Sequence, residues 1–216
     1  MMDVQGIIVY IAVYAIPVVF AITLHEAGHA YAAKFFGDKT AWMLGRTSLN
    51  PVRHIDPVGT VLVPILTAFT GFLFGWAKPV PVNFENLRDP KRDMLWVAAA
   101  GPGANLAMAL GWVLVAKVLL MAGGDGVAYE FWIRVADAGI KVNVGLAVLN
   151  LFPLLPLDGG RILMSVLPNR LAWQYSRLEP FGMVILILLI VSGALWWMIV
   201  PVMGALLKNI YSLLGF

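Results

Sequence analysis

The chain has 216 residues, of which 61% are apolar and only 12% are charged, with 15 basic and 12 acidic side chains and a formal charge of +3. Soluble domains carry about 25% charged residues, so this composition cannot cover a water-facing surface. The mean hydropathy of +0.85 excludes disordered, coiled-coil and collagen-like classes, and the lack of cysteine excludes disulfide scaffolds and thiolate metal sites. The small positive charge indicates loop orientation in a membrane protein, and we expect no nucleic-acid partner.

Five long apolar stretches follow one another along the chain: residues 4–24, 57–77, 94–117, 142–157 and 180–207. A helix needs about 20 residues to cross the hydrocarbon, so we expect an all-α polytopic membrane protein with about four to five membrane helices. Pro201 and Gly204 are expected to kink or end the last stretch before an amphipathic tail. The chain shows no repeat or long linker, which predicts one domain over residues 1–216, with its core over about 4–167 and a C-terminal helix and tail over about 178–216.

Basic residues predict which side of the membrane the loops face. Four of them lie between positions 34 and 53 and none precedes the first stretch, so the positive-inside rule places this segment in the cytoplasm. Four more lie between positions 78 and 92, so both ends of residues 57–77 favour the cytoplasm. We therefore expect residues 57–77 to enter the membrane and return, with a full span as the alternative.

The segments on either side of this re-entrant stretch are expected to be extended. Residues 78–83 alternate proline with valine, a pattern that suits an edge strand or a polyproline stretch and not a helix. Residues 47–56 are expected to be extended as well. The sequence therefore predicts a re-entrant, partly β-like segment after the first helix.

The pattern His25-Glu26-Ala27-Gly28-His29 stands at the end of the first apolar stretch. With three histidines and four glutamates in the chain, chance predicts only roughly 0.0008 occurrences of H-E-x-x-H. On a helix, positions i and i+4 share a face, so both imidazoles can bind one zinc ion while Glu26 lies close enough to act on a water molecule. The alternative is a polar helix end that meets solvent, which would not require this spacing.

A catalytic zinc ion has three protein ligands and one open position, so a third ligand is expected. The candidates are His54, Asp56, Asp137 and Asp158. Asp158 follows Pro153 and Pro156, which stop regular helix and let the chain bend a carboxylate inward. The alternative for Asp158 is the N-cap of a helix over residues 159–167.

Two further polar residues need an interpretation. We expect His54 to contact substrate or to support a metal ligand, with a structural role at the interface or direct zinc binding as alternatives. Asn105 ends the segment Gly101-Pro-Gly-Ala-Asn105, which is no nucleotide loop because no strand precedes it. Small residues here favour close helix packing, with Asn105 hydrogen-bonded across helices.

The motifs together resemble the site-two protease family of intramembrane zinc metalloproteases. H-E-x-x-H at the end of an early membrane helix is followed later by N-x-x-P-x-x-P-L-D-G-G-R over residues 150–161, and the resemblance covers residues 20–167. The strings at residues 48–57, 75–83 and 101–105 resemble a compact subgroup without a PDZ or other accessory domain. The resemblance implies that His25, His29 and Asp158 bind one zinc ion, that Glu26 is the catalytic acid/base, and that Asn150 helps to hold the scissile carbonyl.

The implied activity is hydrolysis of peptide bonds in or near the membrane-spanning segments of a membrane-protein substrate, as in regulated intramembrane proteolysis. Its site would open toward the cytoplasm in a multi-pass protein of the cell membrane. The alternatives are a zinc-binding membrane transporter and a catalytically inactive relative that binds membrane segments. For the ligands to meet, the first and fourth stretches must run parallel, with residues 94–121 making the only crossing between them.

Overall fold

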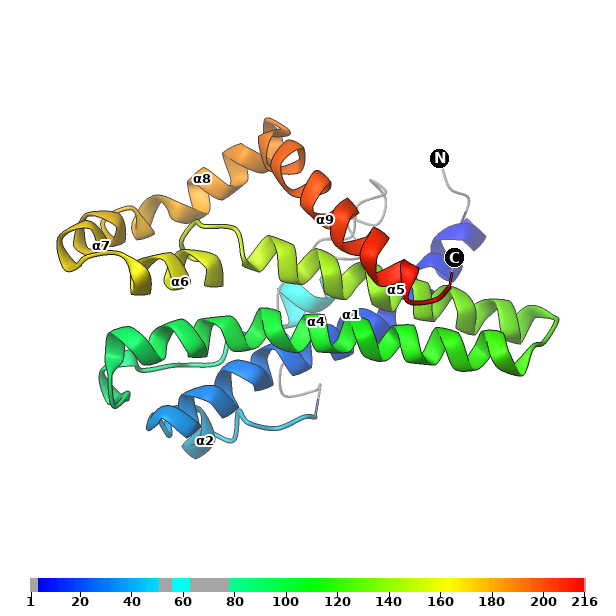
Figure 1. Cartoon of the computed structure of the whole chain (residues 1–216), viewed down its shortest axis with the longest axis horizontal. Helices are drawn as coiled ribbons and strands as arrows, with labels where there is room; N and C mark the ends of the chain where they lie inside the picture. Colours follow the sequence, from blue (N-terminus) through cyan, green and yellow to red (C-terminus); the bar gives the residue numbers. More distant parts are fainter. Residues whose placement is uncertain (1–3, 51–55, 63–77, 216) are drawn as a thin grey trace.

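The computed structural model describes residues 4–50, 56–62 and 78–215 (Figure 1). Its central layer holds three long helices: α1 (Val4–Phe36), α4 (Pro90–Ala122) and α5 (Val127–Asn150). The other helices are α2 (Thr40–Met43), α6 (Asp158–Val166), α7 (Asn169–Ser176), α8 (Glu179–Val191) and α9 (Ala194–Ser212), with a π-helical turn at Pro57–Leu62 and a 3-10 turn at Phe84–Asn86. The described residues contain no strand, which confirms the all-α class.

Within the described part of the chain, three helices are long and apolar enough to cross a membrane: α1 from Gln5, α4 and α9. The pair α7 and α8, bent by 65°, brings this number to four if it counts as one broken span. Helix α5 has 24 residues, but Glu130, Arg134, Asp137 and Lys141 lie along it and lower its apolar character. The expected multi-span membrane protein is therefore confirmed.

Contacts between side chains fix the directions of the three central helices. His29 contacts Val97 while His25, one turn earlier in α1, contacts Asn105 further along α4, so α1 and α4 are antiparallel. Asn105 contacts Asn143 of α5, and Trp112 further along α4 lies against the earlier Gly139, so α4 and α5 are antiparallel as well. Helices α1 and α5 consequently run parallel, as expected, and α4 makes the crossing between them. Residues 63–77 lie outside the described residues, so their re-entrant course stays a prediction.

Helix α4 has clear sequence signals at both ends. Asp89 is its N-cap and accepts a hydrogen bond from the backbone N–H of Arg92, and Pro90 occupies the first turn, where no N–H is needed. Gly123 ends the helix with a positive φ of 62°, which favours glycine. These signals fix where α4 begins and ends.

Residues 78–83 are not helical, as expected, but they form no strand, and the described residues 47–50 form none either. Pro79 and Pro81 remove two of the N–H donors that a ladder would need. Two of the remaining N–H donors bind carboxylate side chains instead. The Val80 N–H donates to Glu26 Oε2 at 2.7 Å and the Asn83 N–H donates to Asp38 Oδ2 at 2.8 Å.

The last apolar stretch does not end at Pro201 or Gly204, where the sequence allowed an end. Gly193, with φ of +77°, separates α8 from α9, whereas Pro201 and Gly204 lie inside α9, which continues to Ser212. A left-handed glycine ends a helix outright, while a proline inside a helix costs only a local hydrogen bond when packing supports the rest. The chain therefore turns at Gly193, and α9 returns along α5 (Figure 1).

Candidate metal centre

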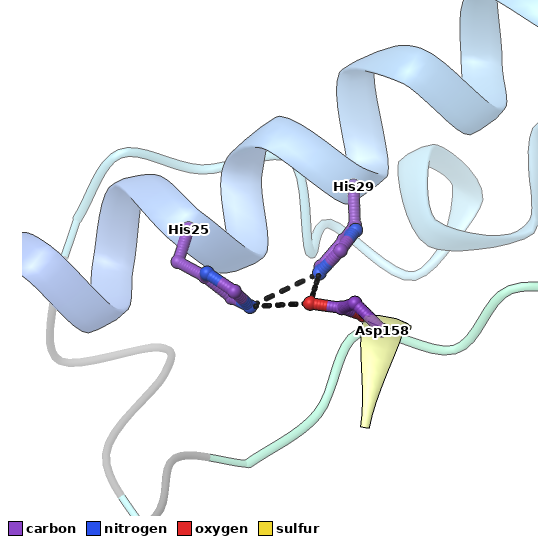
Figure 2. Close-up of side chains that lie close together, drawn as sticks. All are labelled: His25, His29 and Asp158. Atoms are coloured by element: carbon purple, nitrogen blue, oxygen red, sulfur yellow. Dashed lines mark hydrogen bonds and ion pairs between the residues drawn. The ribbon is translucent and has the colours of Figure 1, made fainter. Parts of the chain in front are cut away.

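Three side chains from two distant segments converge in a buried group. His25 and His29 project from one face of α1, and Asp158 is the first residue of α6 (Figure 2). The two Nε2 atoms are 3.1 Å apart, and Asp158 Oδ2 lies 3.3 Å from each of them. Among the described residues, these three form the group of His, Asp and Glu side chains that could hold a metal ion.

The local fold after α5 turns Asp158 toward the histidines. Helix α5 ends at Asn150, and turns over residues 151–157 reverse the chain before α6 begins. A Cβ on Gly159 would lie 2.2 Å from the Leu151 carbonyl oxygen, so this tight reversal needs glycine. Leu157 occupies the N-cap of α6, so the alternative of Asp158 as an N-cap is wrong, and its carboxylate faces the imidazoles.

Hydrogen bonds at the far side of each imidazole define which nitrogen carries the proton. His25 Nδ1 lies 2.6 Å from Asn105 Oδ1, and His29 Nδ1 lies 2.7 Å from the Val97 carbonyl oxygen. Both oxygens only accept, so each Nδ1 donates, and in the neutral imidazole each Nε2 then presents a lone pair toward Asp158. This is the arrangement that metal-binding histidines use.

The donor set fits a zinc ion. Asp158 Oδ2 is a buried oxygen without a hydrogen-bond partner in the described structure, and it lies 3.3 Å from the Nε2 atom of each histidine. With both imidazoles neutral, these atoms present three lone pairs to one point, an arrangement that a cation among them stabilises. Tetrahedral zinc with Zn–N distances of about 2.0 to 2.1 Å separates two nitrogens by about 3.4 Å, close to the 3.1 Å observed here.

Glycine on the neighbouring helix leaves room for this group. A Cβ on Gly101 of α4 would lie 2.4 Å from His29 Nε2 and 2.7 Å from His25 Cε1. Both distances are far below any van der Waals contact, so the two imidazoles occupy the space that a side chain would fill. The small-residue segment expected to pack helices closely thus makes space for the metal ligands as well.

A cavity of about 400 Å³ opens beside the three ligands. Glu26 lines it, and its Oε2 accepts the Val80 N–H, so the carboxylate is aligned by the segment after residue 77. Asn150 lines it too, and its Nδ2 donates to the Leu146 carbonyl oxygen at 3.0 Å, which leaves the second amide hydrogen for another acceptor. The sequence-predicted residues Glu26 and Asn150 therefore share one cavity with His25, His29 and Asp158.

The other candidates lie elsewhere. Asp137 is 2.6 Å from Lys141 and is bonded by Tyr211, away from the three-residue group. Asp56 accepts the Gly59 N–H at the start of the π-helical turn. His54 lies outside the described residues, so its role stays a prediction.

Arg161, the last residue of the motif over residues 150–161, also lines the cavity, and the sequence predicted no role for it. Its guanidinium lies 3.2 Å from Glu179 and over the Phe84 ring, 5.1 Å from its centroid. Asn143, which contacts Asn105 deep between the helices, was also missed. The signal for Asn143 was its place in an apolar helix, two turns before Asn150. An asparagine in such a helix needs a hydrogen-bond partner.

Comparison with known proteins gives the class of this chain. It is 34% identical over 194 residues to "Putative zinc metalloprotease YwhC" of Bacillus subtilis, covering 88% of this chain and 85% of that protein. It is 30% identical over 191 residues to "Putative zinc metalloprotease Rip2" of Mycolicibacterium smegmatis, covering 86% of this chain and 70% of that protein. No family model and no solved structure gives a significant match.

The names of these relatives, the helical membrane fold and the two-histidine, one-aspartate group support a membrane protein with a zinc-protease role. The chain belongs to the site-two protease family. The resemblance that its motifs indicated is therefore confirmed.

Proposed function

We propose that this protein is a zinc-dependent endopeptidase that cleaves membrane-protein substrates in or near their membrane-spanning segments. The observation that carries the proposal is the convergence of His25, His29 and Asp158 on one point beside Glu26, in a cavity between helices that can cross a membrane. The three converging residues would hold one zinc ion per chain. Bound there, zinc would supply polarisation of the substrate carbonyl and a lower pKa for water.

Glu26 is the proton carrier in this mechanism. Its carboxylate faces the cavity, where it takes a proton from the attacking water and passes it to the leaving amine. The Val80 N–H bond at 2.7 Å holds the carboxylate in place while the second oxygen, Oε1, is left for the water.

Asn150 stabilises the carbonyl oxygen of the scissile bond. One of its amide hydrogens is bound to the Leu146 carbonyl, and the other is directed to the oxygen that gains negative charge. Removal of such a donor in other hydrolases costs about 2.7 to 4 kcal/mol of transition-state stabilisation, so the contribution of Asn150 is expected to be large.

The substrate is a protein segment whose helix unwinds locally. A peptide bond inside a membrane helix is covered by helix hydrogen bonds, so hydrolysis requires an extended stretch at the cavity. Pro79, Val80 and Val82 form one apolar wall beside the ligands and suit such a stretch. The ligand end of α1 leads to Lys34, and the nearby start of α4 carries Lys91 and Arg92, which supports a cavity that opens toward the cytoplasm of the cell.

A transporter and an inactive relative are the alternatives. A transport site needs no carboxylate placed for proton transfer, whereas Glu26 lies in the cavity directly after a ligand. An inactive relative would not need the ligands and Glu26 together. The combination favours hydrolysis.

The substitution Glu26→Gln tests the proposal. The unmodified protein and this variant are both expected to hold one zinc ion per chain, measured by metal analysis of the purified protein, but only the unmodified protein is expected to cleave a reconstituted single-span membrane protein. Asp125→Asn, in the exposed loop between α4 and α5, is the control and should cleave normally. Equal cleavage by the Gln variant would contradict the role of Glu26, and zinc movement across vesicles without cleavage would favour the transporter.

A further inference from the structure

Two asparagines lie fully buried between the central helices. Asn105 of α4 and Asn143 of α5 each have an exposed fraction of 0%. An unpaired amide in such an apolar setting is destabilising, so each asparagine needs hydrogen-bond partners. The partners are the other asparagine, two helix carbonyls and a metal ligand.

The orientation of Asn143 follows from its own helix. Its Nδ2 lies 2.9 Å from the Gly139 carbonyl oxygen, one turn earlier in α5. A carbonyl only accepts, so the amide nitrogen of Asn143 must face Gly139 and its Oδ1 must face α4. Asn143 therefore offers α4 an acceptor and no donor.

The orientation of Asn105 follows in turn. Its Nδ2 lies 3.0 Å from Asn143 Oδ1 and 3.2 Å from the Ala21 carbonyl oxygen of α1. Both neighbours are acceptors, so both amide hydrogens of Asn105 are used and its Oδ1 must point the other way. That oxygen lies 2.6 Å from His25 Nδ1.

We propose that Asn143 and Asn105 act as a two-step chain of positioning residues that fixes His25 in its Nδ1–H tautomer. Because Asn105 can offer His25 only an acceptor, the proton stays on Nδ1 and the Nε2 lone pair stays directed at Asp158. This inference rests on the proposed zinc site and adds how α4 and α5 prepare one of its ligands. Neither asparagine touches the reacting atoms.

The second histidine provides an internal comparison. His29 Nδ1 is held by the Val97 main-chain carbonyl, which no substitution of a side chain removes. Changes at Asn105 and Asn143 should therefore affect His25 and leave the tautomer of His29 unchanged. An asparagine pair that only joined the helices would affect both histidines alike or neither.

The first test measures the tautomer directly. In the zinc-free full chain in detergent micelles, with ¹⁵N-labelled histidine, the ring nitrogen shifts report which nitrogen of each imidazole is protonated. Asn105→Leu is expected to move His25 away from a pure Nδ1–H form, while His29 keeps its shifts. Asn105→Asp retains an acceptor for His25 and should restore the Nδ1–H form. If Asn105→Leu does not fold, Asn105→Ala removes the same acceptor with less crowding.

The second test measures zinc affinity by competition with a chelator. Loss of a residue that supports a metal-binding histidine lowers affinity about 10- to 100-fold, so Asn105→Leu is expected to raise the Kd for zinc by this factor. Asn143→Leu should have a smaller effect, because the Ala21 carbonyl still holds Asn105. Val113→Ala, a buried change two turns further along α4, is the matched control and should lower stability without changing the Kd.

Two results would overturn the inference: an unchanged His25 tautomer in the Asn105 variants, or equal losses of zinc affinity in Asn105→Leu and Val113→Ala. Failure of the unmodified chain to bind zinc would refute the proposed function instead. The tautomer measurement on the zinc-free chain would still decide whether the asparagines position His25.

Discussion

At the scale of single residues, the candidate metal centre depends on the absence of a side chain at Gly101. Gly101 makes no hydrogen bond to the ligands, yet a Cβ at its position would lie 2.4 Å from His29 Nε2. Gly103, two residues further along α4, has nothing within 4 Å of the same hypothetical atom. The two glycines of one short segment therefore have different reasons to be glycine.

This difference gives a matched pair of substitutions. Gly101→Ala is expected to push the imidazoles from their positions and raise the Kd for zinc. The expected increase is roughly 10-fold or more, as for the loss of other residues that support a metal ligand. Gly103→Ala should leave the Kd unchanged and raise the melting temperature, because alanine is about 1 kcal/mol better than glycine inside a helix. Equal Kd values for the two variants, measured by chelator competition, would contradict a crowded contact at Gly101.

At the scale of elements, Asp38 ties the end of α1 to the segment that aligns Glu26. Its buried carboxylate accepts hydrogen bonds from the Thr40 and Asn83 backbone N–H groups and from the Asn86 side chain. Burial alone would raise the pKa of Asp38, but these hydrogen bonds outweigh it and hold the pKa below its usual range. The folded protein therefore favours the ionised carboxylate.

The pH dependence of stability follows from the lowered pKa of Asp38. A carboxyl group whose pKa is lower in the folded state stabilises the fold above its unfolded pKa of about 3.9 and loses this contribution as pH falls through the lower, folded value. Asp38→Asn is expected to lower the melting temperature at pH 7 and to flatten its decline below about pH 5. Asp125→Asn, in an exposed loop, should change neither, and the same acid profile for Asp38→Asn and the unmodified protein would refute the assignment.

The sequence predicted the candidate ligand residues better than the residues that hold them in place. The sequence could place His25 and His29 on one face of a helix, with Glu26 beside them, because i, i+4 spacing is a local property of a helix. Asp158 stayed one of several candidates until a family resemblance was added, because its approach depends on the reversal over residues 151–157. The pairing of Asn105 with Asn143 depends on the register of α4 against α5, and no local pattern contains that register.

The same limit explains the errors in the fold. Pro201 and Gly204 were expected to kink or end the last stretch, but the helix does not end there: it breaks at Gly193, where a left-handed glycine turns the chain and α9 gains contacts with α5. The alternation of proline and valine at residues 78–83 predicted an extended segment, and tertiary contacts gave it hydrogen bonds to Glu26 and Asp38 in place of a strand. Local patterns thus identified where the chain departs from helix but not what it binds there.

At the scale of the whole molecule, α9 is joined to the central layer by a polar contact far from the metal centre. The Tyr211 hydroxyl donates to Asp137 Oδ1 at 2.5 Å, and Lys141 Nζ lies 2.6 Å from Asp137 Oδ2. Charged side chains on a helix packed among apolar membrane helices are costly unless they are paired, so both partners stabilise Asp137. The contact lets α5 carry ionisable residues and still pack inside a membrane protein.

Loss of the contact between Tyr211 and Asp137 should lower stability and leave metal binding unchanged. Tyr211→Phe keeps the ring and removes the hydroxyl, and a hydrogen bond to a partly exposed carboxylate contributes about 1 kcal/mol, so the melting temperature is expected to fall by a few degrees. The Kd for zinc should stay unchanged, because Asp137 lies on α5 more than three turns before Asn150 at the cavity. Tyr129→Phe is the control, since the described structure gives its hydroxyl no hydrogen bond. A loss of zinc affinity in Tyr211→Phe alone would instead show that docking of α9 on α5 is coupled to the ligands on α1 and α6.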